Sequence, residues 1–155
     1  MTGKYADGTT VSVPRSRDEV YRLLERYGAD QRIVGDDATR ATVGFRLKGR
    51  HVKIDRALPP RRSFSSQAGY DREIRRQWRV LILLLKARLE IVAEGAETVE
   101  EAFASYLMLP DGSVVGDHLT EVIDTAYRTG QMPESILPGL PPPPKVIELP
   151  QRSGT

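Results

Sequence analysis

The sequence predicts an α+β fold: an antiparallel sheet of three or four strands with a helix on one face, followed by a long helix and a helical C-terminal half. Three observations predict it. Apolar residues recur at helical spacing over residues 16–27, alternate with polar residues over 41–54, and return to helical spacing over 70–94. Strands gathered in one stretch and helices in another are typical of the α+β class.

The first predicted elements are a strand and a helix. Residues 9–13, "TTVSV", alternate and are rich in β-branched residues, which favours a short strand. The helix follows over 16–27. Ser16 and Glu19 have the spacing of a capping box, and Gly28 suits the position just past a helix end.

A β-hairpin is predicted next. Its apolar positions alternate with polar ones along both arms, and Lys48-Gly49 forms the turn between them. "RIVG" at residues 32–35 supplies a further strand. The N-terminal part, residues 8–58, therefore has the predicted order β-α-β-β-β, with one apolar sheet face covered by the helix.

The stretch "RRQWRVLILLLKARLE", residues 75–90, contains six consecutive apolar residues between arginines. Six residues are too few to cross a bilayer, which takes roughly 18. Helical spacing of apolar residues over 70–94 instead predicts a long core helix. We expect its middle to be buried on nearly all sides and its basic N-terminal turns to project beyond the core.

The remaining chain is predicted to be helical up to residue 130. Thr98 and Glu101 have capping-box spacing, a tight turn surrounds Gly112, and Asp117 caps a last helix. The predicted organisation is one α+β domain over residues 1–139, with a helical part over 70–130. Residues 140–155 form a proline-rich tail that is predicted to be disordered.

Composition limits the chemistry available to the 155-residue chain. It has no cysteine and only two histidines, so disulfides are excluded and a zinc site is not expected. Nucleophile elbows, phosphate-binding glycine loops and metal-ligand clusters are all absent from the sequence. The first residues lack a signal-peptide pattern. We therefore expect a cytoplasmic protein that is not an enzyme and needs no cofactor or metal.

Charge is strongly segregated along the chain. Residues 40–88 contain 14 Lys and Arg against 3 Asp and Glu, a net charge of +11, whereas residues 89–155 carry a net charge of −8. A basic segment favours a polyanionic partner. Eleven of the 14 basic residues are arginine, which suits two-pronged contacts with phosphates and stacking on bases.

Nucleic acid, DNA or RNA, is therefore the predicted partner. The predicted phosphate contacts come from the polar face of the hairpin, the loop after it and the first half of the long helix. They are Arg46, Lys48, Arg50, Lys53, Arg61, Arg62, Arg72, Arg75, Arg76 and Arg79. Phe64 and Tyr70 are the aromatic residues closest to the basic loop. An alternative is that these cations pair with the acidic C-terminal part.

A second hypothesis is a protein-binding inhibitor or adaptor with a host or phage protein as its partner. Basic and acidic surfaces on one chain also allow copies to pair with one another, so a homo-oligomer belongs to this hypothesis. No membrane association is expected.

Several motifs resemble a family of small uncharacterised proteins of phages and prophages. They are "RYGA" (26–29), "FRLKGRHVKI" (45–54), the Lys-Ala-x-Leu-Glu segment of the long helix, "LPDG" with the following Val-Gly, and the "AYRTGQMP" ending (126–133). The resemblance covers most of residues 8–139. It implies a mobile-element setting and carries over no catalytic residue. The predicted sheet followed by a long helix also has a general likeness to the core of single-strand annealing proteins.

Overall fold

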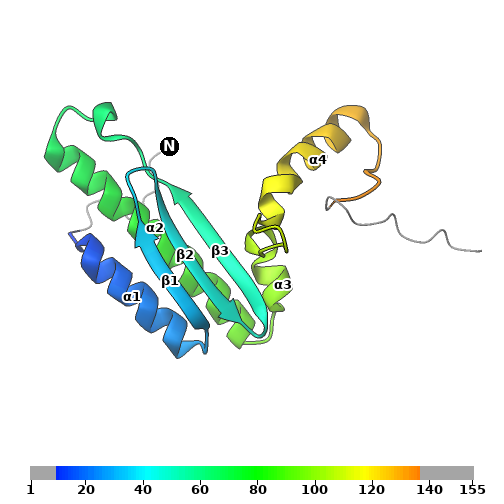
Figure 1. Ribbon diagram of the computed structural model, residues 1–155, viewed down its shortest axis with the longest axis horizontal. Helices are drawn as coiled ribbons and strands as arrows, with labels where there is room; N and C mark the ends of the chain where they lie inside the picture. Colours follow the sequence, from blue (N-terminus) through cyan, green and yellow to red (C-terminus); the bar gives the residue numbers. More distant parts are fainter. Residues whose placement is uncertain (1–9, 137–155) are drawn as a thin grey trace, which may run out of the picture. The chain divides into compact units, whose positions relative to one another are not determined.

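The computed structural model describes residues 10–136, which form an α+β fold (Figure 1). The chain divides after Asp117 into two compact units. The elements in order are α1 (Val13–Arg26), β1 (Asp30–Asp36), β2 (Arg40–Leu47), β3 (Arg50–Ala57), η1 (Arg61–Ser63), α2 (Gln67–Ala93), α3 (Val99–Ala102), η2 (Ala104–Tyr106) and α4 (Val115–Thr129).

The sheet is an antiparallel meander in the order β1-β2-β3. The predicted hairpin is confirmed: Leu47 pairs with Arg50, and Lys48 and Gly49 take positive φ values of 46° and 78° in the turn. Two successive residues with positive φ match the twist of the strands on either side. The predicted strand at 32–35 is also confirmed as β1.

Helices α1 and α2 lie on one face of the sheet (Figure 1). The alternation of β2 places its apolar side chains on this face, where Val43 and Phe45 are 0% and 2% exposed. They pack with Trp78, Leu81 and other α2 side chains in a single core. The opposite face of the sheet is polar, as the alternation predicts.

The predicted start of α1 is wrong, and so is the strand predicted at 9–13. Residues 10–12 have no regular structure, and the helix already begins at Val13. Pro14 does not interrupt it, because a proline in the first helical turn loses no backbone hydrogen bond. Ser12 is the N-cap, while Ser16 is completely buried one turn later.

This difference between the two serines is testable. Ser12 Oγ accepts a hydrogen bond from the Arg15 amide at 3.5 Å, whereas Ser16 Oγ is buried without a partner among the described residues. Ser12→Ala is expected to lower the free energy of unfolding by about 0.5–1 kcal/mol, and Ser16→Ala to leave it unchanged or raise it. Urea unfolding measures both. A larger loss at Ser16 than at Ser12 would contradict the assignment.

The long helix is confirmed as α2, but its predicted burial on nearly all sides is wrong. Leu81, Leu85 and Leu89 are at most 1% exposed and face the core. Leu83 and Ile91 are 39% and 37% exposed instead. The reason is that α1 and the sheet together cover one side of α2 only.

The predicted cap at Thr98 and the predicted turn around Gly112 are confirmed, but the predicted cap at Asp117 is wrong, because α4 already begins at Val115. Thr98 and Glu101 exchange both hydrogen bonds of a capping box. At the LPDG turn, the Gly112 amide donates to the Leu109 carbonyl at 2.9 Å, and Met108 forms a bridge with Val114. The LPDG motif therefore builds a minimal hairpin.

None of the helices between residues 10 and 136 combines the length and apolarity needed to span a bilayer. The predicted tail, 140–155, lies outside the described residues. The single domain over 1–139 stays a prediction.

Candidate nucleic-acid interface

The polar face of the sheet holds two of the predicted phosphate contacts, and both are paired with acids. Arg46 on β2 donates two hydrogen bonds to the carboxylate of Asp30 on β1, at 2.8 and 2.6 Å. Hydrogen bonding to Arg46 lowers the pKa of Asp30. Lys53 Nζ lies 3.4 Å from the carboxylate of Asp55. These two cations are therefore balanced by acids on the same face.

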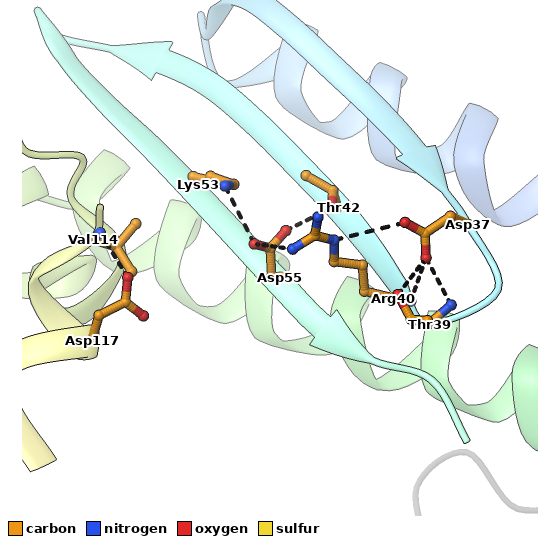
Figure 2. Close-up of polar contacts among 8 residues, drawn as sticks. All are labelled: Asp37, Thr39, Arg40, Thr42, Lys53, Asp55, Val114 and Asp117. Carbon is orange, nitrogen blue, oxygen red and sulfur yellow. Dashed lines mark hydrogen bonds and ion pairs between the residues drawn. The ribbon is translucent and has the colours of Figure 1, made fainter. Parts of the chain in front are cut away.

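Asp55 is the centre of this polar network, as Figure 2 shows. It accepts a hydrogen bond from Thr42 at 2.6 Å, and Arg40 lies between Asp55 and Asp37 at 3.8 Å from each. Hydrogen bonds from Thr39 and Arg40 lower the pKa of Asp37. Three cations and three carboxylates thus neutralise the sheet face.

A cavity of about 230 Å³ adjoins this network and is lined by Lys53, Asp55, Tyr106 and Asp117. The Asp117 carboxylate accepts the Val114 amide at 3.1 Å (Figure 2). Both carboxylates already accept hydrogen bonds within the fold. Among the described residues 10–136, no group of His, Cys, Asp and Glu is arranged to hold a metal ion.

Two further predicted contacts lie at the hairpin turn. Lys48 is exposed at the turn itself. Arg50 donates from Nε to a Glu100 carboxylate oxygen at 2.7 Å and so joins β3 to α3. Of the two, Lys48 has the more accessible charge.

Arg76 and Arg79 on α2 are mostly covered, each with a side chain 16% exposed. Arg76 donates two hydrogen bonds to Glu73, one turn earlier, at 2.9 and 2.7 Å. Arg79 pairs with Glu19 and thereby ties α2 to α1. Both arginines therefore already form ion pairs within the fold, and a phosphate would have to compete with those carboxylates.

Glu19 gives a pH dependence to the junction between α1 and α2. Burial alone would raise its pKa, but hydrogen bonds from Arg79 and Lys86 outweigh burial, and the pKa lies below its ordinary value of 4.5. A lowered folded-state pKa adds stability that is present above the unfolded-state pKa and is lost as the pH falls below it.

Glu19→Gln is therefore expected to lower the free energy of unfolding by about 1 kcal/mol at pH 7, since the pair is partly exposed. The difference from the unmodified chain should shrink as the pH falls below the ordinary carboxyl pKa of 4.5 and vanish once Glu19 is protonated in both states. Urea unfolding at several pH values measures it. A difference that does not change with pH would contradict the ion-pair role.

The four remaining predicted contacts gather at one end of the first unit. Arg61 and Arg62 lie in η1, and Arg72 and Arg75 lie in the first turns of α2. None of them forms an ion pair with any residue of the described range 10–136. We call these four arginines the basic end. Residues 56–79 carry seven arginines against Asp71 and Glu73, a net charge of +5.

Neutral groups orient part of the basic end. Arg61 donates from Nε to Gln67 at 2.9 Å and from one terminal nitrogen to the Phe64 carbonyl at 2.8 Å. These contacts hold η1 against the start of α2 without neutralising the guanidinium. Arg62 and Arg72 are exposed.

Arg75 is more enclosed than the other three. Its Nε is buried and has no hydrogen-bond partner among the described residues. The side chain lines a cavity of about 400 Å³ between the start of α1 and the start of α2, with Ser12, Asp36 and Tyr70 among the other lining residues.

The two aromatic residues predicted near the basic loop do lie there. Phe64 and Tyr70 are half-buried and pack edge to face, with ring centroids 5.7 Å apart. This geometry is favourable for an aromatic pair. Because each ring already contacts the other, the pair stiffens the loop and leaves little open ring surface for stacking on bases.

The sequence identifies ten candidate cations but does not show which of them are paired with carboxylates in the fold. Five of the ten are paired with carboxylates in the structure: Arg46, Arg50, Lys53, Arg76 and Arg79. Arg40 and Arg17 were not singled out, although Arg40 joins the sheet-face network and Arg17 lies over the Trp78 ring with its guanidinium carbon 5.9 Å from the centroid. No local signal in the sequence marks either contact.

Comparison with known proteins identifies no relative: no family model, no curated protein and no solved structure matches the chain.

Proposed function

We propose that the protein is a non-enzymatic, phage-type nucleic-acid-binding protein that contacts phosphates through its basic end. One observation carries the proposal. Arg61 and Arg62 in η1 and Arg72 and Arg75 in the first turns of α2 lie at the same end of α2, and none of the four forms an ion pair within residues 10–136. Arginine is suited to phosphate because its planar guanidinium donates two parallel hydrogen bonds.

The start of α2 strengthens this choice. The first amide groups of a helix carry partial positive charge, so an anion near them is stabilised. Only one of these donors is occupied by the N-cap, since Ser66 Oγ accepts the Gly69 amide at 3.1 Å. The arginines and the N-terminus of α2 therefore both stabilise a bound anion.

The sheet face supports phosphate binding less well. A phosphate there would have to displace Asp30 from a two-pronged contact with Arg46, or Asp55 from Arg40 and Lys53. Each displacement exchanges one anion for another and leaves a carboxylate close to the bound phosphate. We therefore place the nucleic acid at the basic end, with Lys48 and the sheet-face cations outside the main contact.

A titration of the protein with labelled single- and double-stranded DNA and RNA tests the proposal. Four phosphate contacts predict that log K falls with log[salt] at a slope of about −3 to −4 on duplex DNA. From 50 to 200 mM salt, affinity should then fall roughly a hundredfold. Absence of binding at 50 mM salt, or binding insensitive to salt, would reject the proposal.

A protein-binding adaptor is the second candidate, and α4 favours it. This helix is amphipathic, yet no residue in it is buried; Ile123 and Tyr127 are 46% and 89% exposed. Exposed apolar stripes of this kind mark protein-binding surfaces. Under the adaptor function, Ile123→Ser with Tyr127→Ser should abolish capture of the protein partner and leave the nucleic-acid titration unchanged.

A further inference from the structure

Helix α2 has a second apolar face, directed away from the core. At about 100° per residue, five apolar residues fall within an arc of about 100°, opposite the side that packs on the sheet. They are Val80, Leu83, Leu84, Ala87 and Ile91, which we call the outer stripe. Leu83, Ala87 and Ile91 are exposed, and Val80 and Leu84 are half-buried, with Leu84 also packed against the edge of the core.

The outer stripe has the spacing of a helix–helix seam. Val80, Leu84, Ala87 and Ile91 follow one another at intervals of four, three and four residues, as the seam positions of a coiled coil do. This order of intervals reads the same in both directions along the helix. Two copies of α2 in antiparallel orientation therefore bring Val80 of one copy opposite Ile91 of the other, and Leu84 opposite Ala87.

Charge along α2 fits the same orientation. The first half of the helix carries four arginines against Asp71 and Glu73, a net charge of +2. Residues 81–97 carry Glu90, Glu94 and Glu97 against Lys86 and Arg88, a net charge of −1. Arg76 and Glu94 lie on the same flank of the outer stripe, and antiparallel pairing brings Arg76 of one copy to within a helical turn of Glu94 of the other. Parallel pairing would instead place the arginines of both copies together.

We propose that the outer stripe of α2 binds the outer stripe of a second copy, antiparallel, giving a homodimer with two-fold symmetry. A two-fold interface uses the same patch on both subunits and must be self-complementary, which the palindromic spacing and the reversal of charge both provide.

The first test is the mass of the full chain in solution, measured by sedimentation equilibrium without nucleic acid. The proposal expects twice the chain mass of 17.3 kDa. Without nucleic acid present, the result is independent of the proposed phosphate contacts. A monomer at micromolar concentrations would overturn the proposal, whether the outer stripe stays in solvent or is covered by another part of the chain.

Two matched variants place the interface. Ala87→Glu puts a charge at the centre of the seam and should raise the dimer dissociation constant about a hundredfold or more, since the charge is buried without a partner. Ala93→Glu makes the same change at an exposed alanine of α2 outside the outer stripe and should leave the mass unchanged. A dimer that resists Ala87→Glu would show that another surface pairs the copies and would overturn the proposal.

Orientation is measured with spin labels, because the chain contains no cysteine. Single cysteines at Ala68 and Ala93, both exposed, label opposite ends of α2. At about 1.5 Å per residue, antiparallel pairing predicts label separations of about 50 Å at position 68 and about 25 Å at position 93. Parallel helices would give about 10 Å at both positions, and that result would overturn the antiparallel dimer.

Discussion

Arg62→Glu combined with Arg72→Glu is expected to lower the affinity for nucleic acid roughly a hundredfold at 100 mM salt, because two phosphate contacts are lost and two repulsive charges are added. The fold should be unaffected, since both side chains are exposed and form no ion pair within residues 10–136. The salt dependence should also become shallower by about 2 in the slope of log K against log[salt].

A matched control variant has the same net charge as the variant with Arg62→Glu and Arg72→Glu. Arg22→Glu with Arg128→Glu also removes two exposed helical arginines, but both lie outside residues 56–79. Fluorescence anisotropy with labelled DNA and RNA compares the two double variants. Equal losses in both would mean that overall charge, and not the basic end, governs binding, and that result would argue against the proposed site.

Arg75 and Arg79 also lie in the basic segment of the sequence, but they are less suitable than Arg62 and Arg72 for a charge-reversal experiment. Arg79 joins α2 to α1 through Glu19, and Arg75 Nε is buried. Reversing these charges would leave Glu19 facing an acid and would disturb the packing of the two helices. A loss of binding in that variant would not separate misfolding from a lost phosphate contact.

Trp78→Ala is expected to lower the free energy of unfolding by about 4 kcal/mol, the range for deleting a large buried aromatic side chain. Trp78 is completely buried where α2 crosses the sheet, and Arg17 of α1 lies over its ring. The substitution has two costs, because it removes core contacts and also leaves a cavity. Because Trp78 is the only tryptophan of the chain, circular dichroism rather than fluorescence should follow the urea unfolding.

Trp78→Phe is the control for this effect. It keeps an aromatic ring in the core, and the Trp78 indole nitrogen has no hydrogen-bond partner among the described residues that the change would remove. We expect a loss well below that of Trp78→Ala. Equal stability of Trp78→Ala and the unmodified chain would mean that the α1–α2–sheet core does not form as described.

The fold class and most of its elements follow from local signals in the sequence. Alternation over residues 41–54 predicts the hairpin and its face, and Lys48-Gly49 predicts its turn, because both depend on neighbours a few positions apart. Helical spacing likewise predicts α2. The start of α1 could not be predicted in the same way, since Ser12 and Ser16 are both good caps and only the packing shows that Ser16 is buried.

The outer side of α2 shows the same limit. Six consecutive apolar residues predict burial all round, but a helix is buried only where another element lies against it. The number and position of neighbouring elements are tertiary facts. They leave Leu83 and Ile91 exposed and create the outer stripe.

For the candidate interface, the residue types alone show that positive charge concentrates in residues 40–88. Which of those charges are already neutralised depends on how the chain packs. Arg46 pairs with an acid 16 positions away, Arg50 with one 50 positions away and Arg79 with one 60 positions away. Electrostatic attraction depends on distance in space, so pairs this remote in the chain form only when the strands and helices have packed.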